Sequence, residues 1–317
     1  MDVIYPKELK EMIGDGREIA LIDVREQGAF YREHQLFASS IPLSQMELRI
    51  SDMVPRRAAR IVLVDGGRGD NMAERAGKCL EQLGYTNIAI LDGGIKAWKE
   101  TGYEIFSGVN VPSKAFGEIV ERTCNTSRLT AGELKAKIDS GEKLVILDSR
   151  PKDEYHRMNI PGGINTPGAE LVMRIHDLAP DPETFVVVNC AGRTRSIIGT
   201  QSLINAGIPN PVAALKDGTM GWHLAGFELE QGMERYAPAP SPEGLLKARE
   251  FAGRVGKRFG VQKIDHSVLD KWMVERGDRT LYVFDVRLPE EFESGHLEYS
   301  RNAPGGQLVQ ATDEYMA

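Results

Sequence analysis

The chain has 317 residues with 41% hydrophobic and 27% charged side chains, values typical of a soluble globular protein of two or three domains. A formal net charge of −7 argues against nucleic-acid binding by the whole molecule. Three irregularly spaced cysteines form neither a disulfide framework nor a paired-cysteine metal site, so a cytoplasmic location is expected. Neither a leader-like N-terminus nor a run of about 18 apolar residues occurs, so no membrane contact is expected.

The first predicted unit covers residues 1–108. A short apolar strand ends in Asp-Val-Arg at residues 23–25, with an aromatic residue seven positions after the aspartate. A second buried strand over 61–65 is followed by a glycine-containing loop and a helix-like segment, and a third apolar run covers 88–91. Short strands that alternate with helical segments predict an α/β fold, a doubly wound parallel sheet with helices on both faces.

The same order of features recurs in a second predicted unit over 128–235, after a linker at 109–127. Here Asp-Ser-Arg ends the first strand at 148–150, again with an aromatic residue seven positions after the aspartate, and the second buried strand covers 185–189. A recurrence over about 105 residues predicts two tandem domains of one kind, each with its own small core.

An incomplete third copy is predicted over 261–317, after a Pro-rich linker and an amphipathic helix at 236–260. Its Asp-Val-Arg lies at 285–287, and we match its Pro-Gly-Gly at 304–306 to the one at 161–163 in the second unit. Because this copy stops before a second buried strand, it is not expected to complete a core alone. The chain is therefore expected to be a fragment of a longer protein, or the third copy packs on a neighbouring unit or on another chain, for example in a homodimer.

Cys190 is the most promising candidate for chemistry. It follows directly on the strand over 185–189 and opens a basic, glycine-containing loop, which we call the Cys190 loop (residues 190–196). The next helix is expected to begin at about Ser196 or Ile197 with its positive end facing the sulfur, which favours a thiolate over a thiol. A free cysteine is more often inert packing, and we assign that role to the other two cysteines of the chain.

Four motifs in order resemble the rhodanese family of sulfurtransferases. They are the Asp-x-Arg strand end, the Ile-Pro-Gly-Gly turn at 160–163, the Cys-x-x-x-x-Arg-Ser loop and the Asp-Gly-x-x-Gly-Trp segment at 217–222. The resemblance implies tandem rhodanese-like domains in which Cys190 accepts a sulfane sulfur as a persulfide and passes it to a thiophilic acceptor. It also implies a small-molecule donor such as thiosulfate, an acceptor such as cyanide or a thiol, and no metal or organic cofactor. The residues expected to bind the substrate are Ala191, Gly192, Arg193, Thr194, Arg195 and Ser196.

The two arginines of the Cys190 loop have two possible roles. Arg193 and Arg195 can bind the charged oxygens of the donor, because an arginine stays charged and presents a fork of hydrogen-bond donors. Alternatively, either one pairs with a carboxylate such as Asp148, and this structural role is expected more of Arg195. Ser196 is expected to cap the helix, with its hydroxyl near enough to stabilise the sulfur.

The first unit departs from the family pattern at the nucleophile. Its loop reads Gly-Gly-Arg-Gly-Asp-Asn after Asp65, so we expect Gly66 to stand in the place of the cysteine and the unit to be an inactive partner that shapes the active-site entrance. Trp98 and Trp222 occupy equivalent positions in the two units and are expected in the cores.

Two other functions are consistent with these residues. One is a non-catalytic binding or regulatory scaffold that uses Cys190 as a redox sensor. The other, less favoured, is a cysteine-dependent phosphatase or arsenate reductase, which would place the arginine six positions after the cysteine, whereas Arg195 follows at five.

Overall fold

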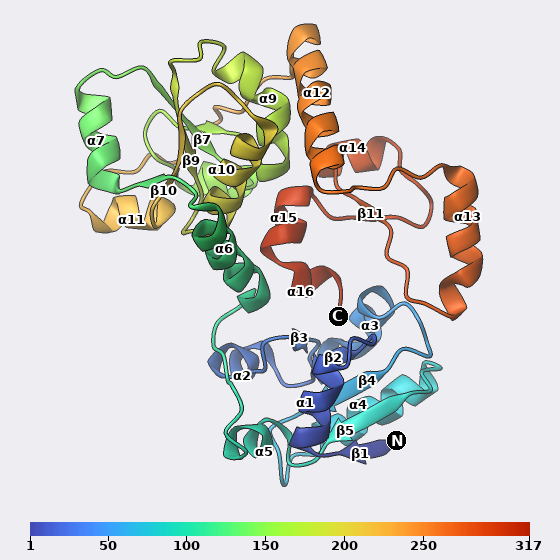
Figure 1. The fold of residues 1–317 in the computed structure, drawn as a ribbon. Coiled ribbons are helices and arrows are strands. Elements are labelled where there is room, and N and C mark those ends of the chain that lie inside the picture. Colours follow the sequence, from blue (N-terminus) through green and yellow to red (C-terminus); the bar gives the residue numbers. More distant parts are fainter.

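The first unit folds around a five-stranded parallel sheet with the strand order β1-β5-β4-β2-β3. The computed structural model describes residues 1–317 and is drawn in Figure 1. Strand β4 is buried along its whole length because helices cover both faces of the sheet. The elements of this unit are β1 (Asp2–Ile4), α1 (Pro6–Gly14), β2 (Ala20–Asp23), α2 (Gln27–Arg32), β3 (Ser39–Ser40), η1 (Leu43–Gln45), α3 (Met46–Met53), β4 (Ile61–Val64), α4 (Met72–Gln82), β5 (Ile88–Leu91) and α5 (Gly94–Glu100).

The second unit repeats this architecture in a parallel sheet with the order β6-β10-β9-β7-β8. The predicted fold class, two doubly wound α/β units in tandem, is confirmed. Its elements are β6 (Arg128–Leu129), α7 (Ala131–Asp139), β7 (Leu144–Asp148), α8 (Lys152–Arg157), β8 (Ile164–Asn165), η2 (Gly168–Glu170), α9 (Leu171–Leu178), β9 (Phe185–Asn189), α10 (Thr194–Ala206), β10 (Val212–Leu215) and α11 (Gly218–Leu224).

Each of the two five-stranded sheets has one apolar cluster on either face. Trp98 and Trp222 are each only 2% exposed and belong to these clusters, as the sequence predicted. Each indole N–H donates to a backbone carbonyl six residues further along the chain, so the polar end of the ring is satisfied as well. No helix of the structure is long and apolar enough to cross a lipid bilayer.

The segment expected to be a linker over 109–127 contains a 14-residue helix, α6 (Val111–Cys124). It packs along α10, and a side chain at Gly117 would come within 3.2 Å of Thr194 in the Cys190 loop. The second connector contains α12 (Pro242–Arg258), which confirms the predicted helix. It packs on α9, and Phe251 joins the core of the second unit.

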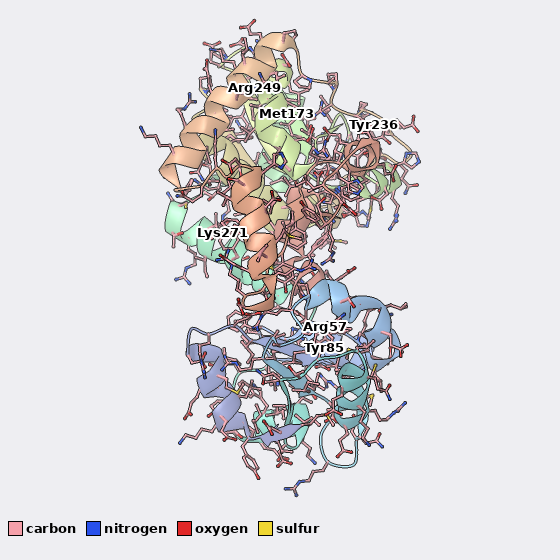
Figure 2. The ribbon with its side chains drawn as sticks, turned by 90° about the vertical axis from the view of Figure 1, so that its right-hand side faces the viewer. Arg57, Tyr85, Met173, Tyr236, Arg249 and Lys271 are labelled. Atoms are coloured by element: carbon pink, nitrogen blue, oxygen red, sulfur yellow. The ribbon has the colours of Figure 1, made fainter.

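The third unit (residues 261–317) has only the two-stranded sheet β11-β12 and no apolar cluster of its own. Its last helices lie between the first and second units (Figure 1). Tyr282 donates from its hydroxyl to the carbonyl of Met53 in the first unit, 2.7 Å away. Figure 2 shows the top of the first unit, marked by Arg57 and Tyr85, facing this third unit. Its elements are α13 (His266–Val274), η3 (Glu275–Gly277), β11 (Phe284–Asp285), α14 (Pro289–Ser294), β12 (Arg301–Asn302), α15 (Gly305–Gln310) and α16 (Thr312–Tyr315).

The match between the two Pro-Gly-Gly segments was wrong. In the second unit Pro-Gly-Gly at 161–163 precedes β8, whereas the segment at 304–306 follows β12. The asparagine side chains of the two strands fix the true equivalence. Asn165 donates to the carbonyls of Asp148 and Arg150, and Asn302 makes the same two bonds to residues 285 and 287. Residues 304–306 therefore correspond to Pro-Gly-Ala at 167–169.

Candidate active site

Cys190 lies directly after the central strand β9 and is only 2% exposed. Strand β9 has β7 on one side and β10 on the other, so the backbone that carries the sulfur is held from both sides. The Cys190 thiol donates to the hydroxyl oxygen of Ser196, with 3.5 Å between Sγ and Oγ. The sulfur therefore sits on a rigid element, within reach of a polar side chain.

The backbone of the Cys190 loop offers free hydrogen-bond donors. None of the N–H groups of residues 191–196 donates a hydrogen bond within the protein. Helix α10 begins at Thr194, within the Cys190 loop. The loop therefore includes N–H groups of the first helical turn, at the positive end of the helix dipole. Such an arrangement is a binding site for an anion.

Two expectations about this helix start were wrong. The helix begins at Thr194, not at Ser196 or Ile197, and Arg193 takes the capping position. Ser196 lies within the first turn, where its hydroxyl donates to the Arg193 carbonyl, 2.8 Å away, and accepts from the Cys190 thiol. A serine inside the first turn can donate to a carbonyl three residues earlier, so its hydroxyl does not cap the helix.

The first residues of α11, which begins at Gly218, bind the backbone of the Cys190 loop. Thr219 donates its N–H to the carbonyl of Cys190, at 2.8 Å, and the next residue, Met220, donates to that of Ala191. Gly218 has φ +55°, and a side chain there would lie 2.2 Å from the Cys190 carbonyl oxygen. Only glycine permits both this conformation and this approach.

Arg193 is held by carboxylates from outside its own loop. Its guanidinium donates to Glu118 at 2.8 and 2.9 Å and to Glu121 at 2.7 Å, both on α6. Asp217 lies 3.7 Å away on the other side. Burial alone would lower the pKa of Arg193, but these three carboxylates raise it above its usual value. The connector helix thus neutralises the first loop arginine.

Arg195 is likewise engaged, and its side chain is only 10% exposed. It donates to both carboxylate oxygens of Glu154, at 2.7 and 2.8 Å, and to the side-chain carbonyl of Gln307, at 3.1 Å. Burial would lower the pKa of Arg195, but Glu154 and the nearby charge of Cys190 raise it. The structure therefore places both arginines in ion pairs, although the partners differ from the one that we named.

Asp148, the carboxylate named as a possible partner, pairs instead with Arg150. Both side chains are almost fully buried, and Arg150 donates two parallel bonds of 2.6 and 2.8 Å. The amide of Asn189 donates to the same carboxylate and to the hydroxyl of Thr219. These buried bonds connect the end of β9, one residue before the sulfur, to β7 and to the first turn of α11.

In the first unit, Asp65 stands at the position of Cys190, so the assignment of Gly66 to that place was wrong. The sheet register pairs Asp23 with Val64 and Asp148 with Asn189, which makes the following residues, Asp65 and Cys190, equivalent. The Asp65 carbonyl also accepts the N–H of Ile95 as the Cys190 carbonyl accepts that of Thr219. The alignment failed because the first loop is longer and Val-Asp resembles Val-Asn by sequence alone.

In the Asp65 loop (residues 65–71), two carboxylates accept N–H groups of the loop and of the first turn of α4. Asp65 accepts from the N–H groups of Gly67 and Ala73, at 2.9 and 3.1 Å. Asp70 accepts from those of Gly66 and Met72, at 3.0 and 3.1 Å. Burial raises the pKa of Asp65, and these bonds offset part of the rise. This loop therefore contains its own anion and no nucleophile.

Sequence reasoning missed four residues that contact the loop arginines. They lie far away in the chain or looked like ordinary surface residues, and they are Glu118, Glu121, Glu154 and Gln307. An amphipathic pattern over 111–124 would have indicated the helix but not its partner.

Comparisons with known proteins agree with this architecture. A model of the rhodanese-like domain matches residues 5–101 and again residues 130–225. The chain belongs to the rhodanese-like family. It is 52% identical to a thiosulfate sulfurtransferase of Pseudomonas aeruginosa of known structure, with a TM-score of 0.96 over 99% of this chain and 59% of the other.

Two curated relatives match parts of the chain. A putative sulfur carrier protein of Bacillus subtilis is 28% identical over 46% of this chain and 82% of its own length. An HTH-type transcriptional regulator of Mycobacterium tuberculosis is 34% identical over 33% of this chain and 45% of its own length. The chain thus spans less than two thirds of both this regulator and the Pseudomonas enzyme.

Proposed function

We propose that this chain is a sulfurtransferase that moves a sulfane sulfur from thiosulfate or a similar donor to a thiophilic acceptor, through a persulfide on Cys190. The observation that carries the proposal is a buried thiol at the head of six consecutive backbone N–H groups without a partner. The similarity of nearly the whole chain to a thiosulfate sulfurtransferase supports the same reaction class.

The reaction has two displacement steps. The Cys190 thiolate attacks the sulfane sulfur of thiosulfate, the S–S bond of the donor breaks, and sulfite leaves with its electron pair. A nucleophilic acceptor, cyanide or a thiolate, then attacks the outer sulfur of the persulfide, and the Cys190 thiolate leaves. Two easier displacements thus replace one direct transfer, and no atom comes from outside the two substrates.

The backbone, more than the arginines, supplies the charge stabilisation. A persulfide that has lost its proton carries its charge on the outer sulfur, and the unpartnered N–H groups of residues 191–196 are available to stabilise this charge. Both loop arginines already have carboxylate partners, so their hydrogen-bond donors are less available to bind a donor directly. We propose that Arg193 and Arg195 shape the electrostatic field of the site, with Gly192 and Thr194 among the direct binding groups.

The decisive experiment exposes the purified chain to thiosulfate and measures its intact mass. We expect a gain of one sulfur atom per chain, lost again on addition of cyanide with release of thiocyanate. Cys190→Ser should gain nothing, while Cys79→Ser and Cys124→Ser should behave like the wild type. Sulfur uptake by Cys190→Ser, or none by the wild type, would sink the proposal.

The two alternative functions have less support from the geometry. A redox sensor does not require an anion-binding loop, whereas the N–H groups of residues 191–196 have no partner in the protein. A phosphatase needs its loop arginine free for the phosphate, and Arg195 is bound by Glu154. All three cysteines are free, and we propose a reducing compartment, the cytoplasm, for the reaction.

A further inference from the structure

The third unit reaches the candidate active site through one side chain. Gln307, on α15, accepts a hydrogen bond from Nη1 of Arg195, 3.1 Å away and 112 residues distant in the chain. The same nitrogen donates to Glu154 at 2.7 Å. Arg195 is thus held between α8 of its own unit and a helix of another unit.

Gln307 lies there because two backbones touch. A side chain at Gly306 would come within 3.2 Å of the backbone nitrogen of Gly168, and one at Gly305 within 3.1 Å of Ala169. Since Pro304 follows β12 as Pro167 follows β8, equivalent turns of the third and second units pack on each other. Small residues on both sides allow this approach, and it brings the next residue, Gln307, to Arg195.

Further contacts fix the position of α15. Lys152 of α8 pairs with Glu290 of α14 at 2.8 Å. On the opposite side, the C-terminal helix α16 is bound to the first unit, where Glu314 pairs with Arg49 at 2.8 Å. A hollow of about 240 Å³ borders Arg195, walled by α10 and by residues 305–310 of the third unit. These pairs connect the neighbouring helices α14 and α16 to the second and first units, so contacts on both sides of α15 support its position beside Arg195.

We infer that Gln307 is a positioning residue for Arg195, so that the third unit forms part of the active site carried by the second unit. This inference rests on the proposed function. Arginine has five N–H donors, and Glu154 and Gln307 accept three hydrogen bonds from Arg195. The Nε–H of Arg195 has no partner in the protein, and its direction depends on how the outer nitrogens are held.

The electrostatic consequence reaches the sulfur. The charge of Cys190 raises the pKa of Arg195, so the two groups lie close enough to interact. If Gln307 is lost, Nη1 keeps only Glu154, and the guanidinium is drawn toward α8. An anionic donor at Cys190 then meets a weaker positive field, whereas an uncharged reagent is hardly affected.

The test compares Gln307→Met and Gln307→Glu with Gln262→Met, a matched change at an exposed glutamine of the third unit. Two quantities are measured on the full chain: the KM and kcat for thiosulfate, and the rates at which iodoacetate and iodoacetamide alkylate Cys190. We expect Gln307→Met to raise KM roughly threefold to tenfold, with a smaller change in kcat. The ratio of the iodoacetate rate to the iodoacetamide rate should fall in parallel.

Gln307→Glu keeps an acceptor in place and adds a negative charge, so it should fold even if Gln307→Met does not, and its iodoacetate ratio should fall further. KM values and alkylation ratios within twofold of those of Gln262→Met would overturn the inference. If the wild type takes up no sulfur, the proposed function fails. The alkylation ratio then still decides whether Gln307 positions Arg195, because it requires no transfer activity.

Discussion

The Asp65 loop and the Cys190 loop occupy the same place in two copies of one fold, but they differ in whether a side chain of the loop accepts the backbone N–H groups. In the first, carboxylates of the loop itself accept four backbone N–H groups. In the second, the six N–H groups that follow the thiol in the chain have no partner. The first copy shows that this backbone can bind an anion, since a carboxylate of the loop occupies it. In the second copy the equivalent N–H groups remain free, and we propose that they bind an anionic donor.

The largest expected effect comes from turning the second loop into the first. Cys190→Asp and Cys190→Ser should both abolish sulfur transfer, but only the aspartate brings a carboxylate that competes for the free N–H groups. We therefore expect Cys190→Asp to bind thiosulfate at least about tenfold more weakly than Cys190→Ser. Titration calorimetry of the two variants measures the difference. Equal dissociation constants would mean that the N–H groups do not bind the donor.

The next largest effect is expected at Arg193, whose guanidinium pairs with Glu118 and Glu121 of α6. The double variant Glu118→Gln, Glu121→Gln should free the guanidinium for an anionic donor. We expect kcat/KM for thiosulfate to rise about threefold to tenfold, less at high salt because added ions screen exposed charges.

A matched control for this change removes two surface carboxylates from α7 and the turn after it, in Asp139→Asn, Glu142→Gln. They pair with Lys135 and Lys137, so the control alters the net charge by the same amount away from the loop. Its kcat/KM should stay near that of the wild type. A fall in kcat/KM in the α6 variant would show the reverse role, in which Glu118 and Glu121 hold Arg193 in its donor-binding position.

The features that the sequence predicted correctly are local in the chain. A strand that ends just before Cys190, a glycine-containing loop and a helix follow one another within about 20 residues, and three repeats of one pattern indicate the α/β fold. These signals depend on periodicity and on neighbouring residues. The position of the thiol at the end of a strand and the two tandem sheets are therefore predictable from the amino-acid sequence alone.

The contacts that the sequence did not reveal are set by register and docking. Whether Asp65 or Gly66 replaces the cysteine depends on which residues pair across β2 and β4, and side-chain similarity pointed to the wrong one. The partners of Arg193 and Arg195 come from α6, α8 and α15, 41 to 112 residues away. Nothing in a local pattern indicates how a connector helix or a third unit lies on the second one.

The smallest expected effect concerns the buried anion of the first unit. Burial raises the pKa of Asp65, so the folded chain holds this proton more tightly than the unfolded chain. Its contribution to stability is present below the ordinary pKa of an aspartate, about 3.9, and is lost as the pH rises through the raised value. An asparagine does not ionise, so Asp65→Asn does not lose stability when the pH rises through this range. The melting temperature of Asp65→Asn relative to the wild type should therefore be more favourable at pH 7 than near pH 4. The opposite trend would mean that the bonds from Gly67 and Ala73 outweigh burial, and that the first loop is stabilised by its own charge.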